Sequence, residues 1–169
     1  GAFQLTESNF GTPYCVKYDS TGTVIWAKKD MGGDGVVFDG GTHIYLWNEA
    51  NLSLQKADLA GTLTWNQIML TTSVFGSSGI MNVQASTTDL YLTGYITGDG
   101  YFSNDTVTNA GNWDVFVARF DADGNNVWAL GGGGGGLDKG YAVFADGNGY
   151  VYATGYYADT AQFGTTTLA

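Results

Sequence analysis

The residues best suited to hold a cation are Asp121, Asp123 and Asn125, whose oxygen-bearing side chains alternate around Gly124. Alternating oxygens of this kind begin a calcium loop, where they close on a hard cation. The same stretch also fits a tight turn between two strands, because a type I turn favours Asp at its first position and Gly at its fourth.

An internal comparison favours the turn. The same frame occurs in three places, "KYDSTGTVIW" (17–26), "KADLAGTLTW" (56–65) and "RFDADGNNVW" (119–128). Each copy has a base, then an Asp, a Gly and a Trp at fixed spacing, but the position of Asp123 holds Thr21 and Ala60 in the other copies. We therefore predict three hairpin turns, and the residues around Asp121 remain the lesser hypothesis of a calcium site.

Other reactive side chains form no recognised catalytic or metal-binding motif. His43 and Cys15 are the only histidine and the only cysteine, too few for an ordinary zinc site within one chain. Cys15 cannot form an internal disulfide and is predicted to be a small buried side chain. No nucleophile motif accompanies His43. Glycoside hydrolysis would need a pair of carboxylates, and no pair among the 16 acids stands out. We predict no catalytic residue and no cofactor.

The glycine run Gly131–Gly136 has the composition of a phosphate-binding loop. A P-loop, however, continues with Gly-Lys-Ser/Thr into a helix, and this run continues with Leu137-Asp138-Lys139-Gly140 and a strand pattern. Its counterparts at 31–33 and 74–79 also fall between repeated segments. The run is therefore predicted to be a linker.

The composition indicates an all-β chain that does not bind nucleic acid. The chain has 27 Gly and 1 Pro among its 169 residues, and 15% of its residues are aromatic, which is typical of many short strands joined by glycine-rich turns. The net charge of −10 opposes contact with phosphates or an anionic membrane surface. No apolar run is long enough to span a membrane.

A second repeated segment alternates with the first. It occurs at 32–48, 78–94 and 138–155, and each copy has a short apolar strand, a polar turn and an alternating strand with a tyrosine. We call this segment the inner hairpin, and the base-to-Trp frame the outer hairpin. Six hairpins predict about twelve strands and a β-propeller-like array of four-stranded antiparallel blades. The array is expected to span 1–169 as one domain, with repeat units near 14–51, 52–113 and 114–169.

The segment 114–156, "DVFVARFDADGNNVWALGGGGGGLDKGYAVFADGNGYVYATGY", resembles the bacterial SBBP repeat, a β-propeller repeat. The matching pieces are Phe120-Asp121, Gly124, Trp128, the glycine stretch before Asp138, and "DGNGYVYATG". The first copy departs from this pattern with Leu46-Trp47-Asn48, where Thr-Gly is expected. The resemblance implies a secreted or surface-exposed bacterial protein, often with a longer chain, and no shared catalytic residues.

Both ends of the chain fall in matching connectors, since the first 19 residues parallel 100–121. About three repeats are fewer than the usual four to eight blades of a propeller. The chain is therefore expected to be an arc, completed by further repeats or by further copies.

The aromatic side chains supply the candidate binding site. Trp26, Trp65 and Trp128 recur and are predicted to be buried at equivalent places. Aromatic residues outside the repeated positions are candidates for contact with a protein or glycan ligand. They are Trp47, Tyr95, Tyr101, Trp113, Tyr156 and Tyr157. The expected function is a non-catalytic, adhesin-like binding or scaffold module, and the alternative is a hydrolase or lyase with a site in loops at the propeller axis.

Overall fold

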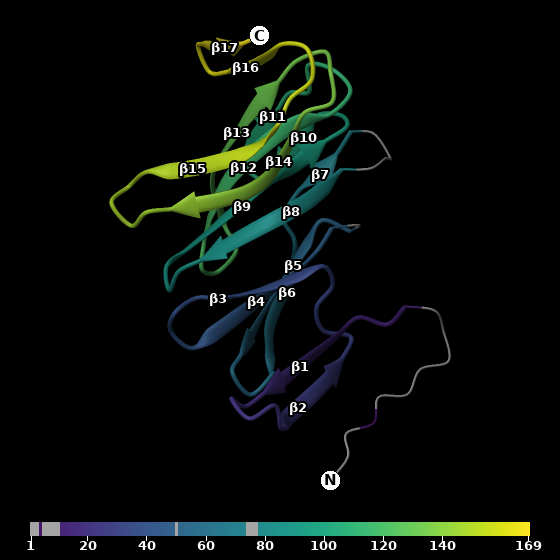
Figure 1. Ribbon diagram of the computed structural model, residues 1–169, viewed down its shortest axis with the longest axis vertical. Coiled ribbons are helices and arrows are strands. Elements are labelled where there is room, and N and C mark those ends of the chain that lie inside the picture. The colour runs from purple at the N-terminus through teal and green to yellow at the C-terminus, as the bar shows by residue number, and fades with distance from the viewer. Residues whose placement is uncertain (1–3, 5–10, 50, 74–77) are drawn as a thin grey trace.

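The computed structural model describes residues 4, 11–49, 51–73 and 78–169, and this part of the chain is entirely strands, turns and loops (Figure 1). The prediction of an all-β chain is confirmed. Most of residues 1–10 and of the linker at 74–79 lie outside the described residues, so the expectations for those segments are not addressed.

The six predicted hairpins are all present. The outer hairpins are β1 (Tyr14–Tyr18) with β2 (Val24–Lys29), β5 (Ser53–Asp58) with β6 (Leu63–Ile68), and β12 (Asp114–Asp121) with β13 (Asn126–Gly133). The inner hairpins are β3 (Gly35–Phe38) with β4 (His43–Asn48), β8 (Gly79–Ala85) with β9 (Asp89–Ile96), and β14 (Lys139–Ala145) with β15 (Val151–Tyr156).

The estimate of about twelve strands was too low, because the described residues contain seventeen. The additional five are β7 (Thr71–Thr72), β10 (Gly100–Phe102), β11 (Asp105–Val107), β16 (Ala161–Phe163) and β17 (Thr166–Leu168). Each has only two or three residues, which is too short to show a period of two in the sequence. They lie in the connectors, where β10 pairs with both β7 and β11, and β16 pairs with β13 and β17.

Each complete sheet joins an inner hairpin to the outer hairpin that follows it. One sheet has the order β3-β4-β5-β6, and the other contains β8-β9-β12-β13 and is extended by β16 and β17. The sheets therefore run across the expected limits of the repeat units. At the two ends, β1–β2 and β14–β15 form separate two-stranded sheets.

The turns of the outer hairpins form as predicted. Oδ1 of Asp58 accepts hydrogen bonds from the backbone N–H groups of Ala60 (2.9 Å) and Thr62 (2.8 Å), and Gly61 has a φ of 75°. The turns that begin at Asp19 and Asp121 repeat this pattern. Glycine suits this turn because a residue with a side chain is strained at positive φ.

The base before each outer turn and the tryptophan after it lie opposite each other, and a β-bulge follows the base. The tyrosine of the inner hairpin extends this pair into a row across the sheet, Tyr45–Lys56–Trp65 in one sheet and Tyr91–Arg119–Trp128 in the other. We call this the Tyr–base–Trp row.

The repeated tryptophans occupy equivalent positions, as predicted, but they are only half-buried. The prediction that they are buried was wrong, because each lies on the second strand of its outer hairpin, away from the inner hairpins that contact one another. A tryptophan at such a position keeps part of its ring in solvent.

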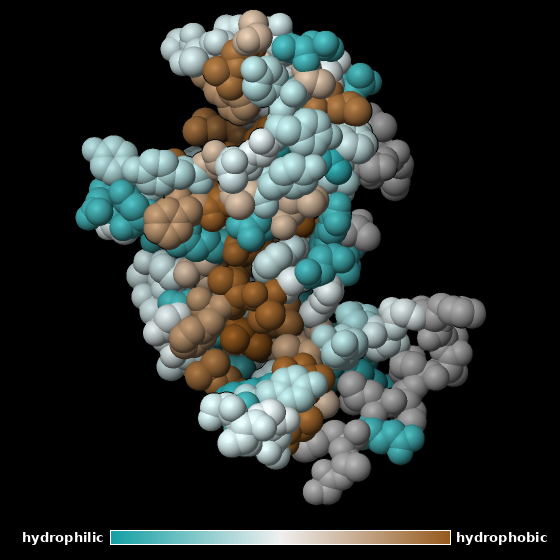
Figure 2. Space-filling model, viewed as in Figure 1, coloured by the Kyte–Doolittle hydropathy of each residue, from teal (hydrophilic) through white to brown (hydrophobic). Residues whose placement is uncertain are grey.

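The main core lies between the two larger sheets. Its fully buried side chains include Tyr45, Leu54, Ile80, Leu92 and Phe116. A smaller cluster, formed by Met31, Leu46 and Ala57, joins the β1–β2 hairpin to the next sheet. On the face shown in Figure 2, hydrophobic side chains gather around β3–β6.

Cys15 packs against the smaller cluster and is half-buried rather than fully buried. The burial raises the pKa of its thiol. Its predicted role as a small packing side chain therefore fits the structure in part.

Candidate functional site

The candidate aromatic residues separate into buried and accessible groups. Trp47 is only 8% exposed and its ring covers Gly35, so it belongs to the core and offers no surface to a ligand. Tyr101 is 43% exposed but lies apart on β10, between β7 and β11. Tyr95 is likewise buried, at 5% exposed, whereas Trp113, Tyr156 and Tyr157 are partly exposed. These four candidates lie near the linker between β13 and β14 or on β15 and the residue after it.

Tyr95 and Trp113 are brought together beside Lys139. The two ring centroids are 5.0 Å apart, and the Lys139 ammonium lies 3.9 Å from the centroid of Tyr95 and 4.2 Å from that of Trp113. An ammonium over aromatic faces is attracted by the ring quadrupoles. We call these three residues, with Tyr156, the aromatic cluster, because Tyr156 lies directly opposite Lys139 in the β14–β15 pair.

Loop contacts hold Trp113 in this place. The backbone N–H of Trp113 donates to the carbonyl of Gly136, and the Trp113 carbonyl accepts a hydrogen bond from the backbone N–H of Asp138. The Tyr95 hydroxyl donates to a Glu49 carboxylate oxygen at 3.1 Å. Burial, followed by that hydrogen bond and the charge of Glu49, raises the pKa of Tyr95 to about 12. Tyr95 is therefore neutral and fixed at physiological pH.

Trp113 and Tyr156 can provide contact area and Lys139 a positive charge, whereas Tyr95 is buried. Tyr156 is 37% exposed, and Tyr157 is 40% exposed and lines an adjacent cavity of about 380 Å³ with Phe163 and Leu168. Aromatic faces of this kind stack on sugar rings and on side chains of a partner, and the lysine favours an acidic group. Sequence reasoning found the aromatic members but missed Lys139, because its position holds Gly79 in the preceding inner hairpin.

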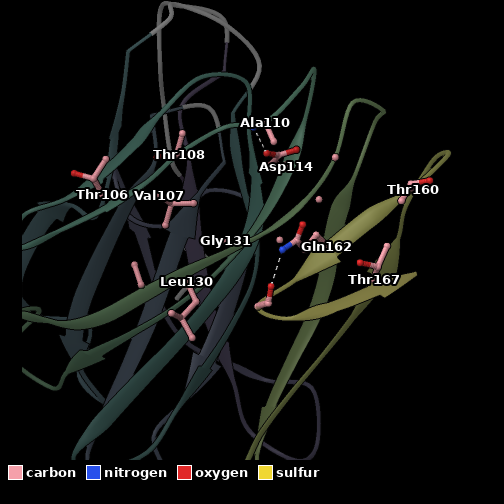
Figure 3. A pocket seen from close by; sticks show the side chains of 15 residues that line it. Thr106, Val107, Thr108, Ala110, Asp114, Leu130, Gly131, Thr160, Gln162 and Thr167 are labelled. Carbon is pink, nitrogen blue, oxygen red and sulfur yellow. Dashed lines mark hydrogen bonds between the residues drawn. The ribbon is translucent and has the colours of Figure 1, made fainter. Parts of the chain in front are cut away.

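A glycine-lined hollow of about 580 Å³ lies near the same linker (Figure 3). Its wall includes backbone from Gly131 to Gly134 and the side chains of Thr106, Asp114 and Gln162. Gly131–Gly133 belong to β13, so the prediction that the whole run 131–136 is a linker was wrong. Residues with a side chain do not fit at these glycines, because neighbouring residues already occupy the position of a Cβ. The ring of Phe163, for example, occupies that position at Gly132.

Asp114 is the unusual group in this hollow. It is 2% exposed, and its Oδ1 has no hydrogen-bond partner, whereas Oδ2 accepts the N–H of Ala110. Burial, and to a smaller extent the charge of Asp138, raises its pKa. A Cβ added at Gly133 would lie 2.5 Å from an oxygen of Asp114 and 2.8 Å from one of Asp138, so both carboxylates face that glycine.

Asp138 itself has a structural role. One of its oxygens accepts the N–H of Gly134 and the other accepts the N–H of Ala158. Ser78 makes the equivalent bond to the N–H of Thr97 at the preceding inner hairpin. No sequence signal identified the Asp114–Asp138 pair, because the fold brings together the first residue of β12 and the residue before β14, which are far apart in the sequence.

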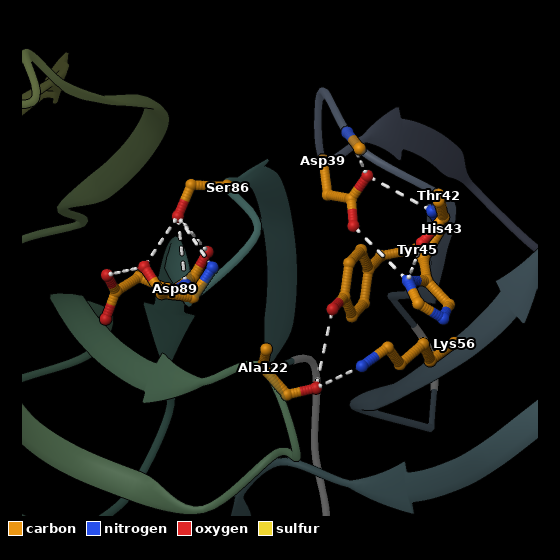
Figure 4. Close-up of polar contacts among 10 residues, drawn as sticks. Asp39, Thr42, His43, Tyr45, Lys56, Ser86, Asp89 and Ala122 are labelled. Carbon is orange, nitrogen blue, oxygen red and sulfur yellow. Dashed lines mark hydrogen bonds and ion pairs between the residues drawn. The ribbon is translucent and has the colours of Figure 1, made fainter.

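The structure shows the surroundings of the candidate calcium residues and of His43. Oδ1 of Asp121 accepts the N–H groups of Asp123 and Asn125, and Oδ2 accepts the Asn125 amide, so its oxygens serve the turn. His43 Nδ1 lies 3.4 Å from Asp39 in the β3–β4 turn (Figure 4). In the described ranges, no three His, Cys, Asp or Glu side chains are grouped so that they could hold a metal.

The repeated bases link successive outer hairpins. The Lys56 amine donates to the carbonyl of Ala122 at 2.9 Å (Figure 4), and the Lys17 amine donates to the carbonyl of Leu59 at 3.0 Å. Both acceptors hold the second position of the next outer turn. Both lysines therefore have a structural role.

A search with protein-family models found no match to the chain, and a search of the curated proteins found none. Nothing in the described segments forms a helix with the length and apolarity needed to cross a bilayer.

Proposed function

We propose that the chain is a non-catalytic binding module, and that its ligand contacts the aromatic cluster. The observation that carries this proposal is the placement of Lys139 over both Tyr95 and Trp113. The repeated polar groups are used within the repeats, with the turn aspartates on backbone N–H groups and Lys17 and Lys56 on carbonyls. The aromatic cluster is instead specific to one place in the array.

The sheets are the blades of a β-propeller arc in this proposal. Support comes from the first strands of successive inner hairpins, since β8 packs against both β3 and β14. Consecutive first strands that contact one another are arranged as strands around a propeller axis. The repeat pattern also underlies the proposed relationship to SBBP-type bacterial proteins, and with it a secreted or cell-surface location.

The ligand is a glycan or a protein segment with an acidic group. Stacking on aromatic rings suits sugar faces and apolar side chains, and the Lys139 ammonium suits a carboxylate or sulfate. The net charge of −10 makes a general attraction to polyanions unfavourable, so the acidic group must be recognised locally.

An array of neutral and acidic glycans and a library of acidic peptides, probed with the purified chain, test the proposal. We expect Trp113→Ala and Lys139→Ala to weaken binding of any hit at least about tenfold, as for a central aromatic or charged contact. Tyr101→Ala is the matched control, since it removes an exposed tyrosine away from the cluster. Urea unfolding of each variant separates lost binding from lost folding. Equal binding by all three folded variants would exclude the aromatic cluster.

A second candidate, a hydrolase or lyase, is favoured by Asp114. A buried carboxyl with a raised pKa beside a second carboxylate has the properties of a general acid. A screen of glycoside and ester substrates distinguishes the two functions. Turnover that is abolished in a folded Asp114→Asn variant supports catalysis, whereas its absence across the screen supports the binding module.

A further inference from the structure

The two-stranded sheets β1–β2 and β14–β15 correspond to the two halves of a complete four-stranded sheet. In each complete sheet, the second strand of an inner hairpin pairs with the first strand of an outer hairpin, as β4 pairs with β5 and β9 with β12. In the described part of the chain, β15 has no outer hairpin beside it and β1 has no inner hairpin. Figure 1 shows β1–β2 at the lower end of the molecule and β14–β15 in its upper half, below β16–β17.

The free edges carry unpaired backbone groups in matching positions. The backbone N–H of Asp146 donates to the carbonyl of Tyr150, so the backbone N–H and C=O of Tyr150 point toward β14. Because backbone groups alternate along a strand, those of Val151, Ala153 and Gly155 point to the open edge. By the same reasoning from the Asp19–Thr23 bond, the groups of Tyr18 point to the open edge of β1.

Side chains at the two ends are exposed where their counterparts are buried. Tyr14 and Tyr18 are 66% and 58% exposed, whereas Phe116 and Phe120, at the same positions of the third outer hairpin, are 0% and 1% exposed. Tyr152 is 57% exposed, whereas Tyr45 at the equivalent place is fully buried. Exposed apolar groups of this kind mark a surface that packs against a partner.

A cavity beside Arg119, which we call the socket, lies at the position that corresponds to the contact between a repeated lysine and the following outer turn. The turns at 58–61 and 121–124 receive the lysine of the preceding outer hairpin on a backbone carbonyl. Arg119 holds the equivalent position but pairs instead with Asp89 at 2.7 Å. A cavity of about 460 Å³ is lined there by Arg119, Trp128 and Tyr150.

We propose that copies of this chain associate head to tail, with β15 of one copy pairing antiparallel to β1 of the next. The repeat fixes the register. Because Thr93 pairs with Val117, Thr154 pairs with Cys15 of the next copy. Because Tyr91 pairs with Arg119, Tyr152 pairs with Lys17 of the next copy and forms a third Tyr–base–Trp row with Trp26. The turn 19–22 of that copy enters the socket, where Arg119 donates to the carbonyl of Ser20.

A second copy is the occupant because the chain itself presents, in β1–β2, an outer hairpin with an open edge. The edges match in backbone spacing, and the exposed tyrosines of β1 face the apolar groove beside β15. This groove is lined by Val117, Leu130 and Val151. The association does not depend on the proposed binding function, because it uses neither Lys139 nor Trp113.

Disulfide trapping tests the register. Thr154 and Cys15 would form a pair without backbone hydrogen bonds between them, so their Cα atoms would lie about 4.5 Å apart, within disulfide range. We expect Thr154→Cys to give a ladder of cross-linked chains in an oxidising, non-reducing gel, with the mapped linkage joining Cys15 of one copy to the thiol introduced at position 154 of another. Moderate salt should favour the ladder, since each copy carries a charge of −10.

Tyr150→Cys is the matched control. This position is also exposed, at 66%, but in the proposed register it lies four residues, or about 13 Å, from Cys15 of the next copy. Equal cross-linking of both variants would overturn the register. Wild-type chain that stays monomeric by light scattering at millimolar concentration, with the β15 edge amides protected from hydrogen exchange, would overturn association between copies and indicate that another segment covers the edge.

Discussion

Gly94→Ala should strongly destabilise the protein, because this glycine permits a close approach between two strands. A Cβ at Gly94 would lie 1.9 Å from the carbonyl oxygen of Gly79, and a Cβ at Gly155 would lie 1.8 Å from that of Lys139. Both glycines face a β-bulge in the first strand of their inner hairpin. The first inner hairpin has Asn48 at this position, and its two strands pair without a bulge.

The size of the effect follows from this geometry. Real Cβ atoms do not approach other atoms closer than 3.0 Å, so β8 must move by more than about 1 Å beside the fully buried Ile80 and Phe116. Overpacking of a core costs about 1–3 kcal/mol, and movement of a backbone places this site at the upper end, about 3 kcal/mol. The melting temperature should fall by about 6–12 °C in a chain of this size.

Urea unfolding monitored by tryptophan fluorescence measures this difference. Gly135→Ala is the control, since a Cβ there has no atom within 4 Å and the position does not have positive φ. It should leave the free energy of unfolding unchanged or slightly increased, because alanine reduces the entropy of the unfolded chain. A Gly94→Ala variant within about 0.5 kcal/mol of wild type would refute the reasoning.

Two further predictions concern buried ionisable groups. Lys56→Met should lower the free energy of unfolding by about 2 kcal/mol, since it removes a charge-assisted bond to the Ala122 carbonyl, whereas Lys28→Met at an exposed position should not. Asp114→Asn should stabilise the protein at neutral pH, because burial raises the pKa of Asp114 in the folded state. Below the unfolded-state pKa of about 4, Asp114 is protonated in both states and destabilises neither. Above the raised folded-state pKa it is charged in both states, and its burial then destabilises the folded state fully. The stability gained by Asp114→Asn should therefore grow as the pH rises between these two pKa values. A gain that is independent of pH in urea titrations would contradict the assignment.

The hairpins could be predicted because their signals are local. Asp58 and Gly61 specify a turn within a few residues, and the repetition of that turn made the calcium site the less favoured interpretation. The pairing of β10 with β7 could not be predicted, since it joins very short strands from distant parts of the chain. Phe102 on β10 is nevertheless fully buried, so these short strands contribute to the core.

The candidate site was predicted in part. Tyr95 and Trp113 were both identified as aromatic residues outside the repeated positions, and the structure brings them into contact. Trp47 was identified for the same reason but fills the space over Gly35, which depends on packing rather than on sequence pattern. Asp114 gave no signal, because its burial results from the loop that contains Ala110 and from the glycines of β13.

The bond from each repeated lysine has a consequence for how such arrays can change during evolution. Lys17 and Lys56 both bind a backbone carbonyl, and the side chains of the residues that supply it, Leu59 and Ala122, take no part in the bond. Any residue that keeps the turn can therefore serve as the acceptor. Whole hairpin units can be duplicated, deleted or exchanged between genes without a compensating substitution at the joint, while the turn side chains remain free to diverge.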